Sequence, residues 1–344
     1  YRNYKLNLID IPNNRFTKFL LPTIDKINFF IFKKNKYQKL RTEITLFAPD
    51  IIISCSNTSS GILMHDKLLN NATIKVPIIP YFMDDWMYKN KSDKIGQLVH
   101  QIIQNMLQKN RFWMMIGEEL GNILAERYQA KADKILYIRN PVDLNNAPKD
   151  APYIKKQTFK IAYAGALWPM HFDSFYAFAK AVKSISDNQK TELILYTQES
   201  QWNWRKAELE PLGVIYGGHL PYNQVHQKLN EADALLITAS FTQENYTHSA
   251  GSLQTKITDY CKSKRLIICC APSYAANNKF IKEHDCGVCI ETNDVQKIGN
   301  SITEIIINID NYQNLVSNAW DTLHNFSKDV VHQNIKDFLQ LSLQ

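Results

Sequence analysis

Short runs of apolar, mostly β-branched residues alternate along the chain with longer segments in which apolar residues recur about every 3.6 positions. The short runs predict buried strands, and the longer segments predict amphipathic helices. This alternation is typical of a parallel sheet with crossover helices, so the predicted class is α/β. In the first half, strands are predicted at 50–55, 78–82, 112–116 and 134–138, and helices at about 60–70, 92–109 and 118–129.

The second half repeats the pattern after a polar segment, 144–158, that contains two prolines and lacks periodicity. Such a segment predicts a linker. Because 344 residues exceed what one hydrophobic core usually covers, we expect two doubly wound, Rossmann-like domains facing across a cleft, at 1–145 and 146–325. A final helix at 326–344 is expected to return to the first domain. The second-half strands are predicted at 160–164, 192–196, 213–216, 234–237, 266–270 and 287–290.

The amino-acid composition indicates what kind of α/β protein this chain is. The chain is 45% hydrophobic and 21% charged, which is typical of a folded globular protein. No stretch is long and apolar enough for a spanning helix, and no export signal is found, so the expected location is the cytoplasm. Six cysteines lie mostly in apolar runs, which favours buried thiols. Cys286 and Cys289 form one C-x-x-C, but a zinc site needs a second ligand pair, and we predict no metal.

Positive charge is concentrated at the start of the chain. Residues 1–45 hold ten Lys and Arg against three acidic residues, a balance of +7 that equals the net charge of the whole chain. Residues 26–47 fit an amphipathic helix with lysines beside its apolar stripe. We expect this helix to contact anionic lipid head groups, so the protein would be peripheral on the inner face of the membrane. An ordinary helix packed on the sheet, or nucleic-acid binding, would also suit these charges.

One segment suggests specific chemistry. Small residues at Ala250, Gly251 and Ser252 precede a helix expected to begin near Gln254, and helix N-termini attract phosphate. Asp259, about one turn into that helix, could accept hydrogen bonds from ribose hydroxyls. Lys256 could face a diphosphate or pair with Asp259. The same residues would also suit a capped amphipathic helix with solvated charges.

The stretch SLQTKITDY at 252–260 resembles the donor-binding segment of the retaining family 4 glycosyltransferases, which have the GT-B fold. The resemblance implies that Asp259 holds the donor ribose in place of a glutamate. Gly251 falls where the longer form of the motif has its first glutamate, which is a second departure. Further matches follow the family's order at 80–86, 112–120, 138–143, 161–173 and 214–237. The family's opening strand and glycine-rich loop are not found at the start of the chain, which would be expected of a sequence that is truncated or lacks a disordered segment.

The match at 161–173 implies that Gly165, Ala166 and Leu167 approach the donor and that His171 meets the diphosphate or the leaving group. A surface histidine capping the helix is the alternative for His171. The match at 214–237 implies that Gly217, Gly218 and His219 line the base pocket.

In the first domain, Asp84, Asp85 and Trp86 directly follow a predicted strand. Asp84 or Asp85 could orient the acceptor hydroxyl or accept its proton, and Trp86 could stack on a sugar ring. The alternative is an Asx turn with a core tryptophan. Ser59 and Ser60 are further candidates for acceptor binding.

Together these matches imply a GT-B glycosyltransferase that moves a sugar, with retention, from a nucleotide-diphosphate sugar to a glycan or a lipid-linked acceptor, without a metal cofactor and without nucleic acid. A GT-B nucleotide-sugar epimerase and a non-catalytic two-domain ligand-binding protein are the alternatives. The expected catalytic residues are Asp84, Asp85, His171 and Lys256; the donor-binding residues are Gly165, Ala166, Leu167, Gly218, His219, Ala250, Gly251, Ser252, Leu253, Thr255 and Asp259; and the acceptor-binding residues are Trp86, Ser59 and Ser60.

Overall fold

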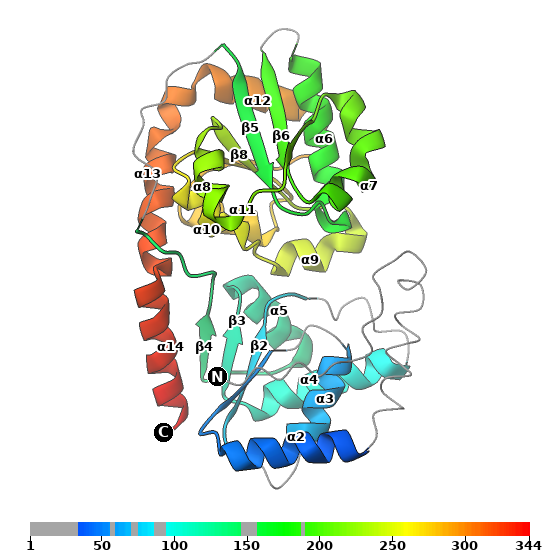
Figure 1. Cartoon of the computed structure of the whole chain (residues 1–344), viewed down its shortest axis with the longest axis vertical. Helices are drawn as coiled ribbons and strands as arrows, with labels where there is room; N and C mark the ends of the chain where they lie inside the picture. Colours follow the sequence, from blue (N-terminus) through cyan, green and yellow to red (C-terminus); the bar gives the residue numbers. More distant parts are fainter. Residues whose placement is uncertain (1–33, 56–58, 70–74, 86–93, 146–156, 187–189) are drawn as a thin grey trace. The chain divides into compact units, whose positions relative to one another are not determined.

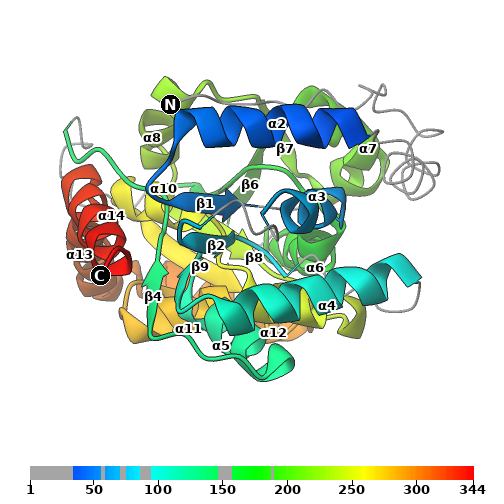
Figure 2. The ribbon, with the colours of Figure 1, turned by 90° about the horizontal axis from the view of Figure 1, so that it is seen from below.

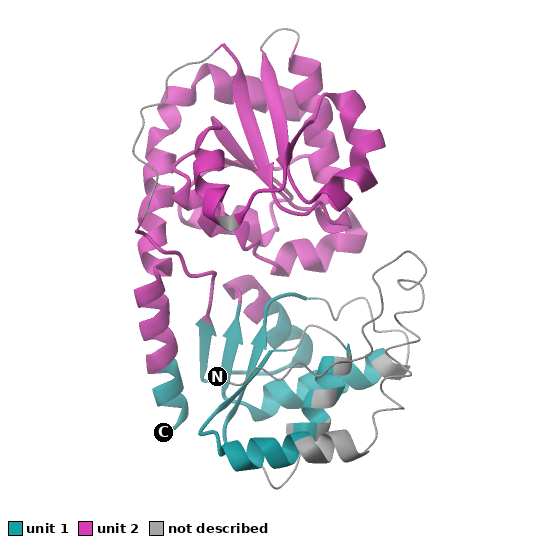
Figure 3. Ribbon diagram, viewed as in Figure 1, with its two compact units in different colours: residues 1–115, 122–136, 338–344 teal, residues 116–121, 137–337 magenta. Residues whose placement is uncertain are grey.

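The computed structural model describes residues 34–55, 59–69, 75–85, 94–145, 157–186 and 190–344. These residues form two compact units, shown in teal and magenta in Figure 3. The first unit comprises residues 1–115, 122–136 and 338–344, and the second comprises 116–121 and 137–337. Along the chain the main division falls at Leu136 and Tyr137, before the polar segment at 144–158 in which the sequence suggests a boundary.

The first unit is built on a four-stranded sheet in the order β1-β2-β3-β4 (Figure 1). Strands β1 and β2 and strands β2 and β3 pair in parallel. Helix α3 packs on α4 and on α2, and Figure 2 shows the same group from below. The predicted elements are confirmed to within two residues, except that the expected helix at 26–47 is described only from Lys34. The elements are α2 (Lys34–Phe47), β1 (Ile52–Cys55), α3 (Ser59–Leu69), β2 (Ile78–Phe82), α4 (Lys94–Lys109), β3 (Phe112–Met115), α5 (Glu118–Tyr128) and β4 (Lys134–Tyr137).

The core of the first unit explains why these short strands form. Phe82 at the end of β2, Trp113 in β3 and Leu107 in α4 are almost completely buried. Trp113 donates its indole Nε1–H to the carbonyl of Asn110 at 2.8 Å, so its one polar group is satisfied. Phe338, near the C-terminus, lies edge-to-face against Phe112 with ring centroids 5.6 Å apart. The last residues of the chain therefore pack with the first unit.

The second unit contains a six-stranded sheet in the order β10-β9-β8-β5-β6-β7, and all of its neighbouring strands are parallel. Strands β5, β6 and β7 progress outward on one side, and β8, β9 and β10 progress outward on the other. The strand order therefore reverses between β5 and β8, where doubly wound sheets bind ligands beyond the carboxyl ends of the strands. The strands are β5 (Phe159–Ala164), β6 (Thr191–Tyr196), β7 (Ile215–Gly218), β8 (Ala234–Thr238), β9 (Leu266–Cys270) and β10 (Val288–Ile290).

Successive residues of the central strands serve two separate cores. Ile161 and Tyr163 of β5 join a cluster with Phe175 of α6 and Ile302 of α12. Ala162, between them, belongs to the opposite cluster with residues of α8, α10, α11 and α13. The sheet is thus buried on both faces, as parallel sheets require. The helices are α6 (Pro169–Ile185), α7 (Glu199–Leu209), α8 (Tyr222–Asn230), α9 (Tyr246–Gly251), α10 (Lys256–Lys262), α11 (Ala276–Glu283), α12 (Val295–Ile307), α13 (Gln313–Thr322) and α14 (Lys328–Ser342).

The predicted strands of the second unit are confirmed, but β7 begins two residues later than the predicted 213–216. Gly213 is not in the strand because it adopts a left-handed conformation, φ +76°, after the short 3-10 helix Glu210–Leu212. Gly217 is in the strand, and a larger residue does not fit there because its Cβ would lie 2.4 Å from Cε1 of Tyr196. Both glycines suggest a turn in the sequence, yet only the first makes one.

All six cysteines are free thiols. Within the described ranges, no group of three or more His, Cys, Asp or Glu side chains could hold a metal ion. No helix in that same part of the chain has the length and apolar character needed to cross a bilayer.

Candidate functional site

The turn after β5 lies at the reversal point of the second sheet. Gly165 follows the strand directly and has φ +129°, a value that side-chain-bearing residues rarely adopt. Its N–H donates to the carbonyl of Tyr196 at the end of β6. Ala166 and Leu167 continue the turn, and α6 begins at Pro169. Leu167 is fully buried in the core, so of these three residues it anchors the turn.

Lys256, at the start of α10, reaches back to this turn. Its Nζ lies 3.6 Å from the centroid of the Tyr163 ring and 3.3 Å from where a Cβ on Gly165 would stand. The Nζ atom is buried, and no hydrogen-bond partner for it is found among the described residues. Burial lowers the pKa of Lys256 from 10.5 to about 7. A buried ammonium group without a hydrogen-bond acceptor is costly, and this one lies where a ligand is expected.

His171, in the first turn of α6, lies beside the same turn. Its Nδ1 is 3.4 Å from Nε2 of Gln254, which also donates to the carbonyl of Thr238 at the end of β8. Burial, together with the nearby charges of Lys256 and His248, lowers the pKa of His171 to about 3. The N-cap of α6 is Trp168 and has no side-chain cap, so a capping histidine is the wrong interpretation. The structure brings Gly165, His171 and Lys256 together from distant parts of the sequence.

The segment before α10 differs from its predicted form. Ala250 and Gly251 are buried in the last turn of helix α9, so their amides belong to a helix and not to an open loop. The amide of Ser252 donates to the carbonyl of His248, and the amide of Gln254 donates to Oδ1 of Asn277. The prediction of free amides at Ala250, Gly251 and Ser252 is therefore wrong, because the chain forms a second short helix there.

Alternate residues from Gly251 to Lys256 face different surroundings. Gly251 and Leu253 line a small pocket together with Glu118, Glu119 and Arg139, within the second unit. Arg139 donates to Glu118 at 2.7 Å, and Lys279 pairs with Glu119. Ser252 instead contacts His248, Gln254 contacts Thr238 at the end of β8, and Lys256 lies beside Gly165 after β5. Helix α10 begins at Lys256, with Thr255 as an N-cap residue that makes no side-chain cap.

Asp259 lies further along α10 and does not pair with Lys256. Its Oδ1 is 3.6 Å from Nε2 of His226 in α8, and its side chain is 28% exposed. Burial raises the pKa of Asp259 to about 6. Gly218, with φ +84°, and the exposed His219 end β7 and lead into α8. The carboxylate of Asp259 therefore lies beside the helix that continues from the predicted base-pocket turn.

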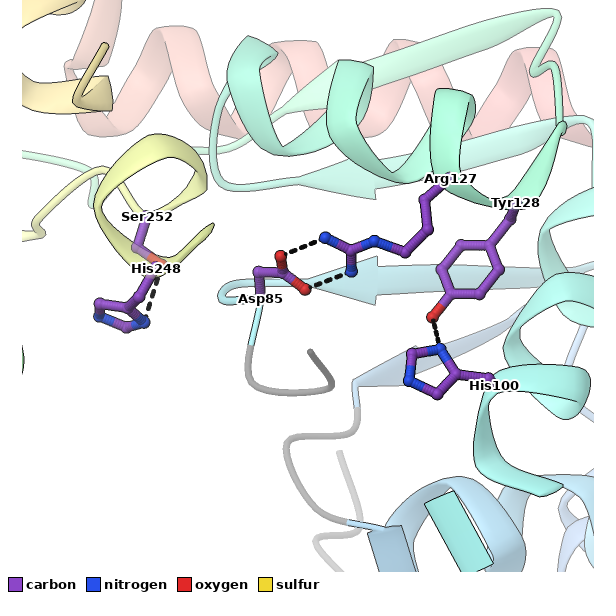
Figure 4. Close-up of polar contacts among 6 residues, drawn as sticks. All are labelled: Asp85, His100, Arg127, Tyr128, His248 and Ser252. Atoms are coloured by element: carbon purple, nitrogen blue, oxygen red, sulfur yellow. Dashed lines mark hydrogen bonds and ion pairs between the residues drawn. The ribbon is translucent and has the colours of Figure 1, made fainter. Parts of the chain in front are cut away.

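In the first unit, Asp85 is only 2% exposed and accepts two hydrogen bonds from Arg127, each 2.6 Å long (Figure 4). Both oxygens of this carboxylate are engaged by Arg127, so its contacts are within the fold and do not support the predicted catalytic role of Asp85. Asp84 is exposed at the end of the strand. Ser59 and Ser60 begin helix α3, and Trp86 lies outside the described residues.

Sequence reasoning missed three side chains that the structure brings to these places. His248 in α9 has its ring centroid 6.2 Å from that of His171, and its Nδ1 lies 3.4 Å from the Ser252 hydroxyl (Figure 4). Gln254 links His171 to β8. Arg127 neutralises Asp85 from 42 residues away. His248 and Gln254 flank the small-residue motif at 250–252, which is the signal that could have indicated them.

No protein-family model matches the chain, and no curated protein matches its sequence. Its structure, by contrast, has the two-domain α/β architecture of the GT-B class that the sequence predicts, and solved structures of that class match it. HepE of Anabaena, solved in complex with UDP and glucose, is 14% identical and aligns over 88% of this chain and 81% of its own, with a TM-score of 0.67. A glycosyltransferase from Rickettsia africae is 14% identical over 89% of this chain and 80% of its own, with a TM-score of 0.66. Sucrose-phosphate synthase from Thermosynechococcus elongatus is 10% identical over 89% and 77%, with a TM-score of 0.69.

Proposed function

We propose that the chain is a glycosyltransferase that moves a sugar from a nucleotide-diphosphate sugar to a hydroxyl group of a glycan or a lipid-linked acceptor. The observation that carries this proposal is the buried ammonium group of Lys256 beside the glycine turn at Gly165, where the strand order of a doubly wound sheet reverses. A diphosphate is the ligand that best matches a buried positive charge at such a place.

The neighbouring residues suit the other parts of such a donor. His171 lies beside Lys256 and can donate a hydrogen bond to a phosphate oxygen. Asp259 carries a partly exposed carboxylate of the kind that accepts hydrogen bonds from paired ribose hydroxyls. The fold adds support, because HepE, which has a similar structure, was solved with UDP-glucose.

For the transfer we favour retention by attack on the same face as the leaving group, with the donor phosphate accepting the acceptor's proton. The enzyme then has to position the two substrates and stabilise the charge on the departing diphosphate. The pairing of Asp85 with Arg127 is consistent with this scheme, because it leaves the first unit's buried carboxylate without a catalytic task. Asp84 remains our candidate for orienting the acceptor hydroxyl. We expect no metal requirement.

We also propose that the protein works in the cytoplasm at the inner face of the membrane. Helix α2 ends with Leu46 and Phe47, which are 80% and 60% exposed and follow a lysine-rich stretch. Exposed apolar residues beside basic ones are suited to an anionic lipid surface. Charge reversal at Lys33, Lys34 and Lys36 should reduce binding to vesicles that contain anionic lipid, and unchanged binding would remove this part of the proposal.

The main test is a donor screen by thermal shift with UDP-, GDP- and ADP-sugars. We expect one base to stabilise the wild type and to lose its effect in Asp259→Ala. Lys180→Ala is a matched control, because Lys180 is exposed and away from the site on α6. Incubation of the bound donor without acceptor separates an epimerase, which would convert the donor, from a transferase. If no nucleotide sugar shifts the melting temperature, the proposed function is wrong.

A further inference from the structure

Three basic side chains from three helices meet beyond the ends of β5 and β8. His171 comes from α6, His248 from α9 and Lys256 from α10. The two imidazole rings are 6.2 Å apart between centroids, and the charges of both His248 and Lys256 act on His171. Helix α9 is thus a third source of positive charge at the turn.

The acidic side chains on the elements around this cluster have other partners or lie at the surface. Asp173 on α6 accepts the amide hydrogen of Phe241 at 2.9 Å. Asp259 on α10 faces His226 of α8, and the charge of Lys262 also acts on its carboxylate. Glu244, before α9, is exposed. Tyr163 of β5 presents its ring face to Lys256, and burial raises the pKa of its hydroxyl.

Desolvation by burial disfavours the protonated forms of Lys256 and His171, and the charges of Lys256 and His248 add to this effect at His171. The pKa of Lys256 falls to about 7 and that of His171 to about 3. A dianionic ligand placed among these groups would reverse the balance, since an opposite charge within about 4–6 Å favours the protonated forms.

We propose that His248 binds the donor diphosphate together with His171 and Lys256, and that this cluster takes up protons from solvent when the donor binds. This inference rests on the proposed function. At Lys256, and to a smaller extent at the two imidazoles, the nitrogen lone pair accepts a proton from the buffer, and the N–H groups then donate hydrogen bonds to phosphate oxygens. The diphosphate of a nucleotide sugar is already fully ionised near neutral pH, so it has no proton of its own to release or take up.

The experiment is isothermal titration calorimetry with UDP-glucose, GDP-mannose and ADP-glucose at pH 7.5. Each titration is run in two buffers with different ionisation enthalpies, because the difference in measured heat gives the number of protons exchanged. From the lowered pKa of Lys256 we expect an uptake of about 0.5–1 proton for each donor bound. Affinity should then fall by about five- to fiftyfold from pH 7 to pH 9.

Titrations of variants identify which residues take up the protons when the donor binds. Lys256→Met should abolish most of the uptake. His248→Gln, which keeps a hydrogen-bonding group near Ser252, should lower the uptake and weaken binding at least about fivefold. His332→Gln is the matched control, because His332 is exposed on α14, away from the cluster. Circular dichroism melts establish that each variant is folded.

The possible outcomes separate the two proposals. Donor binding without proton exchange overturns this inference and leaves the proposed function standing. Wild-type uptake and affinity in His248→Gln overturn the role of His248. Failure of all three nucleotide sugars to bind overturns both the inference and the proposed function.

Discussion

Replacing Lys256 with methionine should make the protein more stable while removing donor binding. In the folded protein the pKa of Lys256 is about 7, whereas its ordinary value is 10.5. Each pKa unit corresponds to about 1.4 kcal/mol, so the difference of about 3.5 sets an upper limit of about 5 kcal/mol on the cost of holding this lysine. Methionine has a similar length and no charge to desolvate. It loses the contact with the Tyr163 ring, which offsets part of the gain, and we expect a net gain of roughly 1–3 kcal/mol.

Whether stability rises or falls with pH follows from the number of protons that Lys256 binds in the folded and in the unfolded chain. Between about pH 7 and pH 10.5 the unfolded chain keeps a proton on Lys256 that the folded protein lacks, so wild-type stability rises with pH across this window. Lys256→Met has no ionisable group at this position, so its stability lacks this dependence on pH. The difference in unfolding free energy between variant and wild type should therefore be large at pH 7–8 and decrease toward pH 10.5.

Urea denaturation of the ligand-free proteins at pH 7.5, 9 and 10 measures this difference directly. Lys180→Met is the matched control, because Lys180 also lies over an aromatic ring, 4.3 Å from the Tyr176 centroid, but on the exposed face of α6. The control should change stability by less than about 0.5 kcal/mol. A Lys256→Met variant that is less stable than the wild type at pH 7.5, or whose advantage does not change with pH, would show that burial of the Lys256 ammonium does not destabilise the fold.

Three further predictions concern other residues. Asp85→Ala should cost about 3–5 kcal/mol in urea denaturation because it removes the carboxylate that compensates the charge of Arg127, and Asp85→Leu combined with Arg127→Met should cost much less; equal costs would contradict a buried pair. Gly217→Ala should cost about 1–3 kcal/mol because its Cβ would meet the Tyr196 ring, and adding Tyr196→Leu should restore part of that loss in thermal melts. The pKa of Asp259 is raised to about 6 from an ordinary 3.8, so wild-type stability is lost as pH rises from about 4 to about 6. Asp259→Asn should remove this pH dependence from the urea midpoints. Urea midpoints that change with pH as in the wild type would argue against the burial of this carboxylate.

The strands could be predicted because each is a short apolar run bounded by polar residues. β2 and β9 match their predicted bounds, and both are largely buried. β7 is different because its end contains Gly217 and Gly218, which suggest a turn in a sequence. Only the position of the Tyr196 ring explains why a glycine is in the strand. That contact joins two strands and has no local signal.

The candidate site could be predicted in part. Gly165, His171 and Lys256 come together as expected, because the carboxyl ends of parallel strands meet at one edge of the sheet. Helix α9 could not be predicted, since the small residues Ala250 and Gly251 suit a loop or a helix equally in sequence. The partner of Asp85 could not be predicted either, because Arg127 is brought to it only by the packing of α5 on the sheet.

Two of the buried charged groups in the described part of the chain, Asp85 and the Lys256 ammonium, illustrate how structural and functional charges differ. Both Asp85 and Lys256 are ionisable groups removed from water, and both come directly after or beside a parallel strand. Asp85 has each carboxylate oxygen bonded to Arg127, so its burial is compensated within the fold. The Nζ of Lys256 lies beside an aromatic ring and a glycine turn, and no hydrogen-bond acceptor for it is found among the described residues. A fold that keeps a costly, uncompensated charge at a ligand-binding position does so for the partner that compensates it, and a diphosphate has the charge to do this.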